Sequence, residues 1–253
     1  MQHHLVKAGR LRLPQGFSLM AIVAGSWAVL VVFTWVGDGA IVRHDRLLQG
    51  GPPLWIATLM FLVGWQVMLW AMMVAPALDA VQQRRSTPGR AWFLLSYLAL
   101  WTCFGLCAFF CDLGVHAAVN HSPWLRLHPW LIAGGLLVFA GTYQLSRLKT
   151  SSLTACRMFI RGAPAGPIRN RTDDLRAGLA YGMRCLGANW ALMLLMFAVG
   201  ASTAVAMAVA TALMLLETTD QRLLNATRVA GYGLIAAGAI VLAGPVLEPL
   251  WIA

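Results

Sequence analysis

Sulfur-containing side chains are the first candidates for chemistry in this sequence. One apolar segment holds Cys103, Cys107 and Cys111 at intervals of four residues, and Asp112 and His116 follow, also four apart. Residues four apart lie on one face of a helix, so these side chains should form a stripe. Thiolates, a carboxylate and an imidazole within a few turns can bind a transition metal. The alternative is that the cysteines are small apolar packing residues.

A second group of sulfur atoms lies in two other apolar segments. Met68, Met72 and Met73 are in one of them, and Cys185 is in the other. Thioethers and thiolates are soft ligands that suit Cu(I), whereas methionine also fills gaps in apolar cores without binding anything. These residues leave two alternatives for a cofactor, which are copper or none.

One arginine, Arg184, lies about two turns inside a long apolar segment. Placing an arginine there costs at least ~2.5 kcal/mol. Its side chain can extend to the nearer membrane surface, pair with Glu217 at the end of the next segment, or contact an anionic lipid or a partner's carboxylate. We take extension to the surface with a structural pair as the default.

The composition predicts the elements that position these residues. Hydrophobic residues make up 59% of the chain and charged residues only 11%, against about 25% charged in soluble domains. The sequence therefore predicts an all-α, polytopic membrane bundle. Five cysteines are an odd number, with three in one predicted span and one in another, so they do not form a disulfide framework. The net charge of +10 fits basic loops at a membrane surface, so nucleic acid is not an expected partner.

Apolar runs of about 20 residues divide the chain into seven predicted spans. Residues 1–15 should form a basic cytoplasmic N-terminus, and residues 16–253 a single transmembrane domain with a long cytoplasmic loop at 147–176. A turn near Gly200 should divide the forty residues of the longest apolar run into two spans. The predicted spans are residues 16–37, 54–77, 91–111, 130–146, two within 178–217, and 229–250.

The distribution of basic residues predicts the orientation. With the N-terminus inside, fifteen of the 19 Lys and Arg residues lie in inner segments and three lie in outer loops. The positive-inside rule favours this orientation. We therefore expect a multi-pass protein of the bacterial inner membrane, with its C-terminus outside.

The last two predicted spans are rich in small residues, including Gly231, Gly233 and Gly238. Small residues let membrane helices approach closely, so these two spans should pack on each other or on a partner protein. The sequence has no nucleotide-binding loop, no catalytic triad and no acidic residue near the middle of a span. We therefore expect a non-enzymatic protein, and a small-solute transporter is a lesser alternative.

Several short motifs occur in a characteristic order. They are Trp70-Ala71-Met72-Met73 with Pro76, Tyr143-Gln144-Leu145-Ser146, Leu148-Lys149, Cys156-Arg157, Gly182, Cys185, Gly187, Trp190-Ala191-Leu192-Met193, Gly200 and Leu215-Leu216-Glu217. In the order and spacing of these motifs, residues 54–238 resemble an uncharacterised bacterial family of predicted metal-binding integral membrane proteins. The resemblance implies a membrane protein with a metal site.

The sequence departs from this family at its cysteine motif. The family pattern Cys-x-Gly-Cys-Cys-Trp is here Cys185-Leu186-Gly187-Ala188-Asn189-Trp190. The metal site has therefore either moved, with the Cys103 stripe as its candidate position, or been lost. We favour an accessory or scaffold subunit of a membrane metalloenzyme or respiratory complex, in contact with the lipid bilayer and other membrane subunits. The alternative is a protein that binds and delivers copper.

Overall fold

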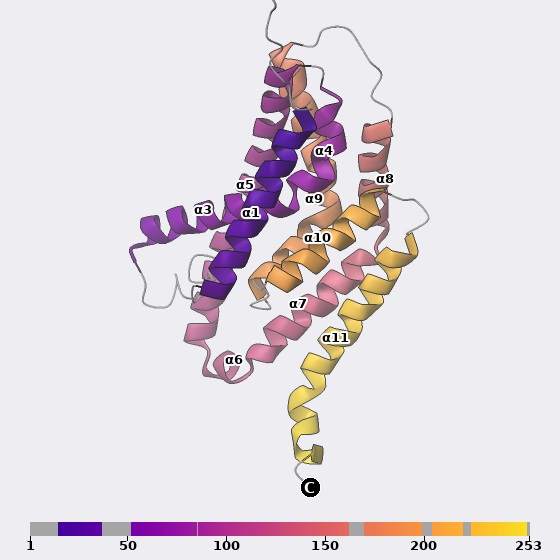
Figure 1. Cartoon of the computed structure of the whole chain (residues 1–253). Helices are drawn as coiled ribbons and strands as arrows, with labels where there is room; N and C mark the ends of the chain where they lie inside the picture. The colour runs from indigo at the N-terminus through magenta and orange to yellow at the C-terminus, as the bar shows by residue number, and fades with distance from the viewer. Residues whose placement is uncertain are drawn as a thin grey trace, which may run out of the picture.

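The computed structural model describes residues 15–36, 52–84, 86–161, 170–198, 204–219 and 224–251, and every regular element in these ranges is a helix (Figure 1). The all-α prediction is confirmed. Residues 1–14 and the predicted turn at Gly200 lie outside the described residues. The helices are α1 (Gln15–Val36), α3 (Leu54–Met72), α4 (Val74–Gln82), α5 (Thr87–His121), α6 (Pro123–Leu127), α7 (Pro129–Gln144), α8 (Arg147–Arg161), α9 (Arg171–Ala198), α10 (Ala204–Thr219) and α11 (Leu224–Trp251).

Within the described residues, three helices are long and apolar enough to cross a membrane: α3, α5 and residues Asn225–Gly244 of α11. A fourth is added if α7 and α8, which meet at a bend of 57°, count as one broken span. Shorter apolar segments occur in α1 and α10. The predicted seven spans are therefore not supported by this count.

The second predicted span is interrupted at Met73, where α3 ends and α4 takes a different direction (Figure 1). Pro76 explains the break, because proline has no N–H and its ring clashes with the carbonyl four residues earlier. Side chains from other helices bind the carbonyls around it. The Tyr97 hydroxyl donates to the Met73 carbonyl at 2.9 Å, the Tyr181 hydroxyl to that of Pro76 at 3.1 Å, and the Trp27 indole to that of Ala71 at 3.0 Å.

Two predicted loops are largely helical. Helix α5 continues ten residues beyond its predicted end and α6 follows, so Asp112 and His116 lie on the helix that carries the cysteines. The predicted cytoplasmic loop at 147–176 begins with α8, which buries Leu153 and Cys156 and exposes Leu148. Helix α8 is amphipathic. Its many basic residues led to the prediction of a loop, although its apolar residues have helical spacing.

Helix α11 packs along α7, and the two lie side by side in opposite directions (Figure 1). A Cβ at Gly141 would lie 2.7 Å from the Gly231 carbonyl oxygen, and one at Gly238 would lie 2.8 Å from that of Gly134. Only glycine fits at this crossing. Gly231 and Gly238 lie at this crossing, where they contact α7 and not the predicted neighbour α10. The Cβ position of Gly233 has open space around it.

Candidate metal site in the helical core

Cys185 lies in the centre of the bundle, on α9, with its side chain buried. Its sulfur is 3.3 Å from the Tyr97 hydroxyl oxygen. That hydroxyl has one proton, which it donates to the carbonyl of Met73 at the break between α3 and α4. The thiol is therefore the donor to the phenol oxygen, and Tyr97 links the Cys185 sulfur to the broken span.

Further polar groups surround the same sulfur. The Asn189 side-chain amide donates to the Cys185 carbonyl at 3.1 Å and lies 3.6 Å from the sulfur. The Trp101 indole N–H also lies near the sulfur, and it makes no regular hydrogen bond. The Asn189 side-chain oxygen has no hydrogen-bond partner either. Buried polar groups are usually paired. A thiolate or a metal-bound thiolate at Cys185 would give the Trp101 indole N–H and the Asn189 amide N–H a stronger acceptor.

Soft ligands gather in the same core. Met72 and Met73, both predicted as candidate ligands, are fully buried in the cluster that contains Cys185, and Met193 belongs to it as well. A second thiol, Cys156 on α8, is also buried there and lies within electrostatic range of Cys185. Thiolate and thioether ligands fit Cu(I). The donor types of this core therefore suit that ion.

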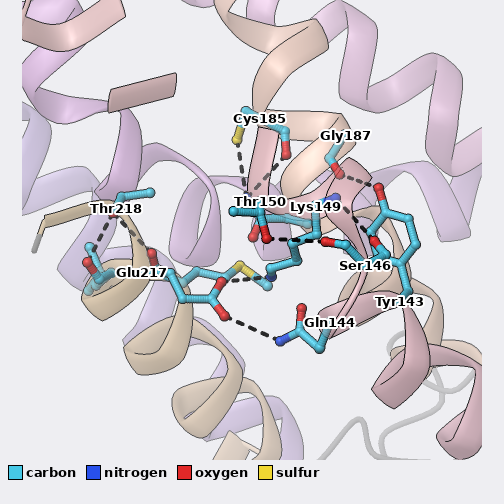
Figure 2. Close-up of polar contacts among 12 residues, drawn as sticks. Tyr143, Gln144, Ser146, Lys149, Thr150, Cys185, Gly187, Glu217 and Thr218 are labelled. Carbon is cyan, nitrogen blue, oxygen red and sulfur yellow. Dashed lines mark hydrogen bonds and ion pairs between the residues drawn. The ribbon is translucent and has the colours of Figure 1, made fainter. Parts of the chain in front are cut away.

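A layer of charged groups closes the core next to Cys185 (Figure 2). The Lys149 ammonium lies 2.7 Å from the Glu217 carboxylate, and both side chains are completely buried. The Gln144 amide donates to the other carboxylate oxygen at 3.3 Å, and the Arg157 guanidinium donates to the Glu217 main-chain carbonyl. These contacts join α7, α8 and α10. The Lys149 charge also lies within electrostatic range of Cys185.

The predicted pair of Arg184 with Glu217 is wrong. The Arg184 guanidinium donates to the Ala180 carbonyl at 2.8 Å and lies 5.5 Å from the centre of the Phe159 ring. Lys149 occupies the place expected for it. The spacing of four residues could have indicated a buried helical face in this predicted loop. They are Lys149, Leu153, Cys156 and Arg157, which lie three or four positions apart.

The cysteine stripe on α5 has a different environment. Cys103, Cys107 and Cys111 are all exposed, and the Asp112 carboxylate lies 3.4 Å from the His116 ring. No group of three or more His, Cys, Asp or Glu side chains that could hold a metal ion occurs within the described residues. Within the part of the chain that the structure describes, neither this stripe nor Cys185 is completed to such a group by side chains of another helix.

Comparison with known proteins gives one match. The family model PpoB2, described as copper chaperone, matches residues 62–241, which is well over half of the chain. The matched region contains the broken span, the Cys185 core and the charged layer. No curated protein and no solved structure matches the chain.

Proposed function

The chain belongs to the copper chaperone family PpoB2, and we propose that it is an integral membrane protein that binds Cu(I) and passes the ion to a partner in the membrane. The observation that carries this proposal is the buried Cys185 thiol, which lies beside the Tyr97 hydroxyl and the Asn189 amide in a core that also contains buried methionines. The protein performs no covalent chemistry on a substrate, and copper is its cargo.

The Cys185 thiolate is the proposed principal ligand. Binding of Cu(I) displaces the thiol proton, because the thiolate is the form that ligates metals. Asn189 and Trp101 then donate towards the charged sulfur, and the Met72 and Met73 thioethers of the same core are the proposed additional soft ligands. A site with one thiolate holds Cu(I) less firmly than one with three, which suits an ion that must be released.

A second candidate function is an accessory subunit without metal of its own. Ala188 and Asn189 occupy the positions where the resemblance implies two more cysteines, and both are buried. The exposed apolar side chains suit contact with lipid or other membrane subunits; Val205, Val229 and Ile240 are each at least 65% exposed. In this role the chain would position a neighbouring metalloprotein or respiratory subunit.

Copper content distinguishes these functions. The full chain is purified in mild detergent after loading with Cu(I), and copper per chain is measured for wild type, Cys185→Ser and the triple variant Cys103→Ser/Cys107→Ser/Cys111→Ser. We expect about one copper per chain in wild type and in the triple variant, and a loss of most copper in Cys185→Ser. Copper lost only from the triple variant would place the site on α5. Absence of copper from wild type, with the chain in a larger complex, would favour the accessory role.

We also propose that the chain crosses a bacterial inner membrane several times, with its N-terminus and α8 on the cytoplasmic side. The excess of basic residues on that side supports it, as does the amphipathic character of α8. Labelling of single introduced cysteines from either side of the membrane tests this placement. Labelling of a cysteine at Arg161 from the outside would contradict it.

A further inference from the structure

A cavity of about 610 Å³ lies where the end of α7, the first turns of α8 and the beginning of α11 meet (Figure 1). Its lining includes Gln144 from α7, Arg147 and Met158 from α8, and Thr227 and Arg228 from α11. It adjoins the Lys149–Glu217 pair but not Cys185. The copper proposal therefore leaves this cavity without a role.

The charge of the cavity is positive. Arg147 and Arg228 are on its wall, and among the described residues no acidic side chain lines it. Lys149 also lines it, but its charge is balanced by Glu217. Guanidinium groups present several donors that match phosphate oxygens. An anionic phosphate compound is therefore the class of ligand that this charge favours.

Two buried polar atoms of the lining have no hydrogen-bond partner, Thr227 Oγ1 and Gln144 Oε1. The residues are only 6% and 2% exposed. Leaving such buried atoms unpaired destabilises a protein, so a ligand that pairs them is favoured. By contrast, the Thr150 hydroxyl already donates to the Ser146 carbonyl and the Thr154 hydroxyl to the Thr150 carbonyl. Recognition of a ligand therefore depends on the two arginines, Thr227 and Gln144.

These atoms specify the ligand further. The Thr227 hydroxyl can donate to a phosphate oxygen, whereas Gln144 Oε1 only accepts and so requires a donor on the ligand. A phosphodiester with a hydroxyl-bearing substituent satisfies both. Apolar side chains also flank the site, since Leu148 is 69% exposed and Met158 68% exposed. They offer a surface for acyl chains beside the charged cavity.

We propose that this cavity binds the headgroup of an anionic phospholipid whose phosphodiester carries a hydroxyl-bearing group, as in phosphatidylglycerol. The arginines and Thr227 contact the phosphate, and a headgroup hydroxyl donates to Gln144. Because Gln144 also donates to Glu217, the lipid contributes to the layer that closes the copper core. The proposal rests on the membrane placement of α8 and not on copper binding.

Native mass spectrometry of the full chain in detergent tests the proposal, with short-chain phosphatidylglycerol, phosphatidylcholine and glycerol phosphate as separate probes. We expect one phosphatidylglycerol per chain, bound on the order of tenfold more tightly than phosphatidylcholine, since each basic residue near a membrane surface contributes about 1 kcal/mol. The double variant Arg147→Gln/Arg228→Gln should lose this preference. Thr227→Val should weaken phosphatidylglycerol binding while preserving the shape of the side chain.

The matched control is Arg126→Gln/Arg161→Gln, which removes the same charge from exposed positions outside the cavity. It should retain the preference. Equal binding of the two lipids, or an equal loss in the control, would overturn the proposal. Glycerol phosphate binding as tightly as phosphatidylglycerol would indicate a small-anion site and overturn the lipid assignment. Copper content is measured on the same samples, so failure of copper binding and failure of lipid binding are separate results.

Discussion

The core and the outer face of the bundle contain the same kinds of residue with different surroundings. Cys185 is buried among a phenol, an indole and an amide, whereas Cys103, Cys107 and Cys111 are exposed along α5. The regular spacing of the exposed cysteines predicted a metal site. Regular spacing along one helix, however, does not bring their sulfur atoms together around one ion. Around Cys185, by contrast, side chains from α5 and α9 meet at one sulfur atom.

The largest expected effect comes from the charged residues. Lys149→Met leaves the Glu217 carboxylate buried without its cation, which should destabilise the protein by about 3–5 kcal/mol. The exposed Arg161 of the same helix provides the control, because Arg161→Met should change stability by less than about 0.5 kcal/mol. Unfolding of the detergent-solubilised variants by denaturant measures both changes.

A double variant makes this test more specific. Lys149→Met/Glu217→Gln removes both charges, so it should recover much of the stability lost in Lys149→Met. Equal stability of Lys149→Met and wild type would show that the buried pair is absent from the protein in solution.

A smaller effect is expected at the glycines of α7. Gly141→Ala places a methyl group 2.7 Å from the Gly231 carbonyl oxygen, and such overpacking costs about 1–3 kcal/mol. Gly135→Ala on the same helix meets no atom within 4 Å, so it should be neutral or stabilising by up to about 1 kcal/mol. Thermal unfolding compares the two, and an equal response would contradict the close crossing of α7 and α11.

The smallest effect separates a buried tyrosine from an exposed one. Tyr97→Phe leaves the Met73 carbonyl and the Cys185 thiol without the hydroxyl, at a cost of about 1–2 kcal/mol. Tyr232→Phe on the exposed face of α11 should change stability by less than about 0.5 kcal/mol. Denaturant unfolding measures both. A stable Tyr97→Phe protein would show that this hydroxyl does not hold the broken span.

The sequence allowed the helical class and most of the long helices to be predicted, because apolar runs and their ends are local signals. It did not give the break at Met73, although Pro76 was its signal, because the run is apolar on both sides. It also did not give the Lys149–Glu217 pair. Those residues are 68 positions apart, and only the packing of α8 against α10 brings them together. Cys185 was identified from the family resemblance, but its neighbours Tyr97 and Trp101 had no sequence signal.

The buried ion pair also has a consequence for biosynthesis. Lys149 is synthesised before Glu217. When α8 emerges from the ribosome, the carboxylate that balances the Lys149 ammonium has therefore not yet been made. Lys149 must therefore remain in water until α10 is made, and α8 can settle into its final position only afterwards. The charged layer is thus completed late in assembly, and the core around Cys185 closes only when nearly the whole chain has been synthesised.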